Sequence, residues 1–251
     1  MNDPTNHLLM KLFDLYQWGD PDEGFYQSGI SSSEIEEMHR SGILDNLYHT
    51  RPVINYSEEE CHYVPDGADE KLQDNLFDLL GVYQILTFKK EGTIFLYESC
   101  IKRVGLRFFA QIGSTLRMSR SYCIDMVREI VLWHELGHWI THWMPGKDRN
   151  RWNTKSYDYN KESKDVYEGL AQIFVQFAIQ QIDEDKTRND YQRMFHYLLQ
   201  NQEACYYRYN DIMRHPKFSW NKLLGAITML RILNNPDDVT FEYLLNNLIE
   251  I

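Results

Sequence analysis

The sequence contains no apolar run that approaches the roughly 20 residues needed to span a bilayer. Its first 18 residues also lack a basic start followed by an apolar stretch and a small-residue cleavage site, so a secretory signal is not expected. These two absences predict a protein that has no membrane-spanning segment and is located in the cytoplasm.

Cysteine is scarce, and the four cysteines are far apart. They are Cys61, Cys100, Cys123 and Cys205, and no two of them form a CxxC pair. This spacing argues against a disulfide scaffold and against a zinc site built from cysteines. We therefore expect a reduced cytoplasmic protein.

Positive charge is in deficit, with 26 Lys and Arg residues against 37 Asp and Glu residues and a formal net charge of -11. Direct nucleic-acid binding through a basic face is therefore not expected. The stretch "YYRYNDIMRHPKFSW" at 206–220 mixes aromatic and basic residues, but a packed surface helix followed by a turn is the preferred interpretation. The chain also lacks GxxxxGK[ST], GxGxxG and GxSxG motifs.

The chain has enough apolar residues to fold, since 43% of its residues are hydrophobic and 14% are aromatic. Its first 75 or so residues are acidic, with helical patches at 6–18 and from residue 31, where "SSSEIEEMHR" begins. We assign residues 1–75 to an acidic, partly helical N-terminal extension and residues 76–251 to the main domain.

The main domain begins with a predicted hairpin and continues as helices. "GVYQILTF" and "GTIFLY" are β-rich runs joined by residues 89–92. Gly113 and the Pro145–Gly146 pair are placed to end the first two helices. The polar stretch at 147–163 predicts a surface loop, with the flexible rim of a cleft as the alternative. Apolar periodicity predicts helices at about 98–111, 121–143, 164–182, 188–203, 219–233 and 238–249. The fold class is therefore α+β, mostly helical with a small sheet.

The segment "LWHELGHWITHW" at 132–143 places His134 and His138 four residues apart in an apolar helix. On an α-helix, residues at this spacing differ by about 40° in direction and about 6 Å in height, so both imidazoles can hold one metal ion. Glu135 flanks the same face and can accept a proton from an attacking water. This is the physical meaning of the HExxH motif, and neutral imidazole suits Zn²⁺. Two core histidines with ordinary hydrogen bonds are the alternative.

A catalytic zinc site needs a third protein ligand. The class with a further histidine six residues after the second is excluded, because position 144 is Met and position 141 is Thr. His142 lies about 12 Å along the helix axis from His134, too far for one tetrahedral ion to bind both. We interpret His142 as a residue that supports a metal ligand without binding the metal itself, or as a cap of the helix end, where a cation is favoured.

Glu168 is the better candidate for the third ligand. At helical spacing it shares a stripe with Ala171 and Val175, and a carboxylate that faces a core is costly unless it is paired or binds a metal. Gly169 and Ala171 are small enough to let this helix approach the first one closely. The alternative is a glutamate in the first turn that the helix dipole stabilises.

With these residues, the pattern resembles the gluzincin metallopeptidases, which pair HExxH with a glutamate on a later helix. More narrowly, it is similar to the ImmA/IrrE-type (DUF955-like) families, in which a small sheet precedes an HELGHxxxH helix and an ExxA-type helix follows. Trp133 and Gln172 depart from the residues common in those families. The matching residues fall within positions 80–180: His134, Glu135, Leu136, Gly137, His138, His142, Glu168 and Ala171.

The resemblance implies a zincin-like metallopeptidase domain with a zinc ion as cofactor and a protein or peptide as substrate. His134, His138 and Glu168 are then the metal ligands, and Glu135 is the general base. A group that stabilises the transition state is also implied, with these candidates: Tyr157, Tyr159, His196, Tyr207, Tyr209 and His215. A non-catalytic, metal-containing protein that acts by binding a partner is the alternative function.

Overall fold

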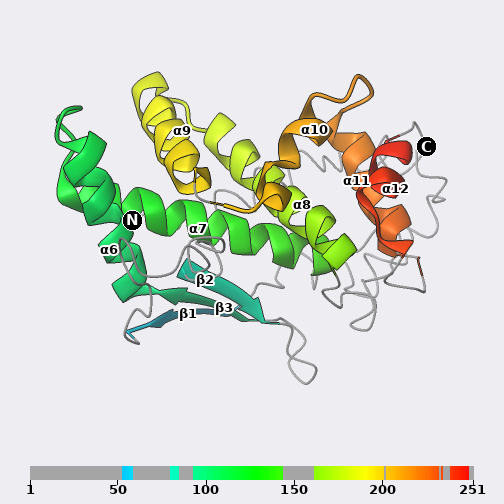
Figure 1. The fold of residues 1–251 in the computed structure, drawn as a ribbon, viewed down its shortest axis with the longest axis horizontal. Coiled ribbons are helices and arrows are strands. Elements are labelled where there is room, and N and C mark those ends of the chain that lie inside the picture. The colour runs from blue at the N-terminus through cyan, green and yellow to red at the C-terminus, as the bar shows by residue number, and fades with distance from the viewer. Residues whose placement is uncertain are drawn as a thin grey trace, which may run out of the picture.

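The computed structural model describes residues 53–58, 80–84, 93–143, 161–200, 202–231, 233 and 238–248. These residues form several helices and one small sheet (Figure 1), which confirms the α+β class. The predicted N-terminal helices and most of the polar stretch at 147–163 lie outside the described residues, as do Tyr157 and Tyr159.

The sheet has three strands in the order β1-β3-β2: β1 (Val53–Ser57), β2 (Gly81–Gln84) and β3 (Thr93–Tyr97). Strands β2 and β3 pair antiparallel, which confirms the predicted hairpin pairing. Strand β1 pairs parallel with β3 and was not predicted. It belongs to the sheet although it lies in the stretch assigned to the N-terminal extension, and the domain boundary after residue 75 stays a prediction.

The helices agree with the predicted ranges to within a few residues: α6 (Glu98–Phe108), α7 (Arg120–Trp143), α8 (Lys161–Gln180), α9 (Asp185–Leu199), α11 (Trp220–Arg231) and α12 (Phe241–Asn246). After α6 the chain makes one π-helical turn, η2 (Phe109–Gly113), which ends at the expected glycine. The aromatic stretch forms η3 (Ala204–Tyr207) and α10 (Tyr209–Met213), followed by a turn. Among the described residues, no helix is both long and apolar enough to cross a membrane.

Helix α7 is the central element of the fold. It lies between the sheet on one side and helices α8 and α9 on the other (Figure 1), and every residue from 130 to 142 is buried. Because it is covered on both sides, it needs apolar residues all around rather than a single apolar stripe. The histidines and the glutamate of its motif therefore lie in the protein core.

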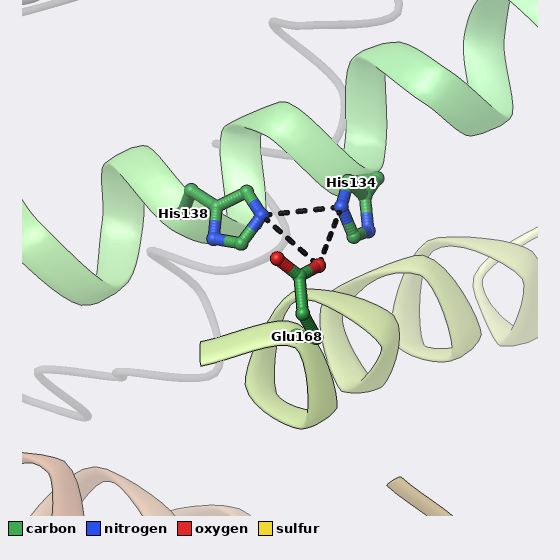
Figure 2. Close-up of side chains that lie close together, drawn as sticks. All are labelled: His134, His138 and Glu168. Atoms are coloured by element: carbon green, nitrogen blue, oxygen red, sulfur yellow. Dashed lines mark hydrogen bonds and ion pairs between the residues drawn. The ribbon is translucent and has the colours of Figure 1, made fainter. Parts of the chain in front are cut away.

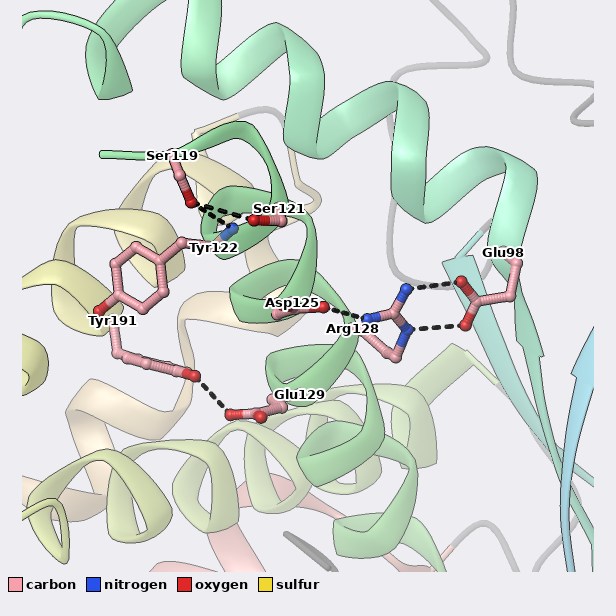
Figure 3. A network of polar contacts seen from close by, with 8 residues as sticks. All are labelled: Glu98, Ser119, Ser121, Tyr122, Asp125, Arg128, Glu129 and Tyr191. Atoms are coloured by element: carbon pink, nitrogen blue, oxygen red, sulfur yellow. Dashed lines mark hydrogen bonds and ion pairs between the residues drawn. The ribbon is translucent and has the colours of Figure 1, made fainter. Parts of the chain in front are cut away.

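Two polar contacts help to fix α7 against its neighbours (Figure 3). Arg128 on α7 donates from Nε and Nη2 to the two carboxylate oxygens of Glu98 on α6, at 2.8 Å each. This bidentate geometry is the stronger form of an ion pair. On the other side of the helix, the Tyr191 hydroxyl of α9 donates to Glu129. These contacts set the orientation of the helix that carries the motif.

The cysteines differ in part from the expected reduced state. Cys100 is disulfide-bonded, and its partner lies outside the described residues. Cys123 and Cys205 are free and buried. The prediction of fully reduced cysteines is therefore wrong at Cys100.

Candidate metal centre

The centre is built where α7 and α8 pack closely against each other. A Cβ atom placed on Gly137 would lie 2.7 Å from the Cα atom of Ala171, so only glycine fits there. Ala171 thus has the predicted role in the close packing. Gly169 does not, because it faces Arg208 and Ile212 instead of α7. This difference arises because residues two apart on a helix point in different directions.

This close packing brings together His134 and His138 of α7 and Glu168 of α8 (Figure 2). The Nε2 atoms of the two histidines are 3.1 Å apart. Oε2 of Glu168 lies 3.2 Å from Nε2 of His134 and 3.5 Å from Nε2 of His138. One ligand atom from each residue thus lies within 4.8 Å of the others, and the group could hold a metal ion.

The spacing of these three atoms matches one face of a metal coordination shell. Zinc bonds of about 2.0–2.1 Å at the tetrahedral angle place neighbouring ligand atoms about 3.3 Å apart. The observed separations of 3.1, 3.2 and 3.5 Å lie on either side of that value. Two imidazole nitrogens and one carboxylate oxygen are also a donor set that zinc accepts. The residues present therefore fit a metal ion.

Burial sets the charge states of the group. His134, His138 and Glu168 are 0%, 5% and 1% exposed. Burial lowers the pKa of His134 to about 4, so its imidazole is neutral near pH 7 and can bind a metal. Burial by itself raises the pKa of Glu168, but the charges and hydrogen bonds of His138 and His134 outweigh it and lower that pKa below its ordinary value. The centre thus combines a neutral imidazole with a carboxylate.

Glu135 lies beside this group and outside it. Its side chain is 3% exposed and packs against the start of β2, where a Cβ on Gly81 would lie 3.2 Å from Oε1 of Glu135. A larger residue at position 81 would press on the Glu135 side chain and would meet Val131 Cγ1 at 2.7 Å. Its position between the motif helix and the sheet is compatible with the predicted role as a base, which stays a prediction.

His142 contacts the sheet and is not part of the ligand group. Its Nδ1 atom lies 2.8 Å from the hydroxyl of Tyr83 on β2, and their ring centroids are 5.9 Å apart. Because burial raises the pKa of Tyr83, that hydroxyl keeps its proton and can donate to Nδ1. His142 therefore joins the last turn of α7 to the sheet, close to its predicted place at the helix end.

Sequence reasoning missed Tyr206, which packs against a ligand. Its fully buried ring stacks on His134 with a centroid separation of 5.9 Å and an interplanar angle of 29°. No local pattern distinguishes Tyr206 from its neighbours in "YYRY", because η3 is placed against His134 by tertiary packing alone. The stacking restricts the orientation of the His134 imidazole.

The described candidates for stabilising the transition state have other contacts. The Tyr207 hydroxyl donates to the Leu199 carbonyl, and the Tyr209 ring packs against Phe195. His196 lies 3.3 Å from the Gln192 amide, and His215 accepts from the Lys217 backbone N–H. Within the described residues, none of the four belongs to the group around Glu168.

Comparisons of the chain with known protein families, with curated proteins and with solved structures gave no match. The functional argument therefore depends on the geometry of the centre itself.

Proposed function

We propose that this protein is a zinc-dependent endopeptidase with a zincin-like domain of the ImmA/IrrE-like, gluzincin type. His134, His138 and Glu168 hold the zinc ion, and Glu135 is the general base. One observation supports this proposal above all others. Two side chains of α7 and one of α8 place three donor atoms 3.1–3.5 Å apart in the protein core.

The bound metal would act as a Lewis acid that polarises the peptide carbonyl. The ligand residues supply a neutral imidazole and a carboxylate, held rigid by burial. Rigid ligands with two nitrogens and one oxygen leave the fourth position of a tetrahedral shell for solvent or substrate.

Glu135 provides the proton transfer that hydrolysis requires. Its carboxylate takes a proton from the attacking water and passes it to the leaving amine. The residue directly follows a ligand in the sequence, so the position of α7 sets the positions of base and ligand together. Gly81 adds a second constraint by letting the Glu135 side chain pack against β2.

The second candidate function is a metal-containing protein that acts by binding a partner. The burial of the group favours it, because His134 and Glu168 are 0% and 1% exposed. Structural zinc sites are closed, whereas catalytic sites keep one position open. Both candidate functions use the same ligands, so the two are distinguished at Glu135.

Exchange of Glu135 for Gln tests the proposed peptidase activity. We expect Glu135→Gln to retain the metal, since Glu135 is not in the ligand group, and to lose cleavage by about 10²- to 10⁴-fold, the usual contribution of a general base. Zinc-loaded wild type and variant are incubated with a proteome-derived peptide library, and new termini are counted by mass spectrometry. Equal cleavage by both proteins contradicts the role of Glu135. A metal-loaded wild type that cleaves nothing supports the partner-binding function.

Exchange of a ligand tests the metal site itself. Purified wild type should contain about one zinc per chain, and His138→Ala should contain almost none, because removing one of three protein ligands opens the site. The matched control is His196→Ala, since His196 is exposed on α9 and should not affect metal content. Metal is measured by elemental mass spectrometry. Unchanged zinc in His138→Ala would show that the ligand assignment is wrong.

A further inference from the structure

Two buried glutamines follow Glu168 along α8 at intervals of one helical turn. Gln172 is 0% exposed and Gln176 is 6% exposed, although the residues around them are apolar. Residues four apart on a helix lie on nearly the same face, about 6 Å apart along the axis. Glu168, Gln172 and Gln176 therefore form one polar stripe within the core.

The amide groups of this stripe have unmet hydrogen-bonding capacity. Among the described residues, neither amide atom of Gln172 has a hydrogen-bond partner, and the same holds for Nε2 of Gln176. On α7, the indole Nε1 of Trp133 is a further buried donor without a partner. Buried amide groups are almost always hydrogen-bonded in folded proteins, because leaving them unpaired in an apolar core is costly.

Local structure does not explain why glutamine occupies these positions. Leucine has a similar helix propensity and would suit an apolar core better. An internal water molecule would explain the choice, because such a water needs two to four polar partners. The amide atoms of Gln172 and Gln176 supply three, and these side chains are close enough along the helix to share one water.

We propose that Gln172 and Gln176 form a buried amide site that binds internal water, and that the hydrated Gln172 helps to hold Glu168 in the metal centre. The water site is independent of the proposed function. The positioning of Glu168 rests on the proposed metal site, because hydrogen bonds around metal ligands commonly set metal affinity. Gln172 acts through another residue and is thus a positioning residue.

Leucine replacements along the stripe test both parts. Gln180 continues the same spacing but is exposed, so Gln180→Leu is the matched control for Gln172→Leu and Gln176→Leu. For each protein, the melting temperature is measured without metal, and zinc affinity is measured by competition with a chelator. If water hydrogen-bonds to the buried amides, the melting temperature should fall for Gln172→Leu and for Gln176→Leu. It should not change for the control, Gln180→Leu.

Zinc affinity should follow the distance from Glu168 along the helix. We expect a loss of about 10- to 100-fold for Gln172→Leu, the usual effect of losing a group that supports a metal ligand, a smaller loss for Gln176→Leu and none for Gln180→Leu. If Gln172→Leu does not fold, oxygen-17 relaxation dispersion on wild type and Gln176→Leu replaces it. Wild type should show a long-lived internal water that the variant loses or exchanges faster.

The possible results separate the parts of the proposal. Higher melting temperatures for both buried variants, or no long-lived water in wild type, overturn the water site. Lower melting temperatures with unchanged zinc affinity support the water site and overturn the positioning of Glu168. A wild type that binds no zinc overturns the proposed function and the positioning role, while the melting temperatures still decide the water site.

Discussion

At the scale of single residues, the centre depends on groups that are each unfavourable in a core. A buried carboxylate such as Glu168 is costly when unpaired, and a buried imidazole such as His134 resists protonation. Placed 3.2 Å apart, the two groups stabilise each other, and a cation would stabilise both further. A bound metal ion would therefore account for three polar residues at a position that packing alone would fill with leucine.

Tyr83→Phe tests the contact that holds His142. Removing one hydroxyl should lower the free energy of unfolding by about 1 kcal/mol, the usual net contribution of such a hydrogen bond. Metal content should be unchanged, because His142 is outside the ligand group. Urea unfolding measures the change.

A double-mutant cycle supplies the control for this contact. In a His142→Phe background, Tyr83→Phe should have little further effect, since the partner of the hydroxyl is already absent. An equal loss in both backgrounds would indicate that the hydroxyl stabilises the protein through another group.

At the scale of helices, the close approach of α7 and α8 determines whether the ligands meet. The contact between Gly137 and Ala171 involves backbone atoms of α8, which cannot rotate away as a side chain can. Any larger residue at position 137 must therefore move one helix relative to the other. Such a movement separates Glu168 from the two histidines.

Gly137→Ala tests this packing. We expect a net loss of stability of about 1–3 kcal/mol from overpacking, partly offset by the better helix propensity of alanine, together with weaker metal binding. The control is Gly169→Ala, where the nearest atom is Cβ of the Arg208 side chain at 3.1 Å. Thermal unfolding and zinc content are measured for both. If Gly137→Ala and Gly169→Ala lose the same stability and the same zinc content, the close helix approach at Gly137 has no special role.

At the scale of the whole molecule, the buried charges make stability depend on pH. In the metal-free protein the pKa of His134 is about 4 when folded and 6.5 when unfolded. The unfolded chain thus binds a proton that the folded protein excludes, so stability falls as the pH drops from 6.5 toward 4. The lowered pKa of Glu168 acts in the same direction at more acidic pH.

We expect His134 to account for a loss of up to about 3 kcal/mol in the free energy of unfolding between pH 7 and pH 4. Urea unfolding of metal-free protein across this range measures the loss. His134→Gln should flatten the pH profile, whereas the exposed His196→Ala should not. Parallel profiles for wild type and His134→Gln would contradict this origin of the acid sensitivity.

The elements that the sequence predicted well are those with strong local patterns. Helix α7 has many apolar residues and a proline after its end, and its two histidines come together through helical spacing alone. Strand β1 could not be predicted in the same way, since it is five residues long and lies in an acidic stretch. Its strand conformation depends on pairing with β3, a contact between distant segments.

By itself, the sequence determined the pair of histidines, the glutamate beside them and the apolar stripe that pointed to Glu168, because helix geometry is local and repeats every 3.6 residues. Only the tertiary structure decided that Gly137 rather than Gly169 lies at the helix contact, that Tyr206 stacks on His134 and that His142 bonds to Tyr83. These contacts join segments that are distant in the chain, and their formation depends on how the helices and the sheet pack against each other.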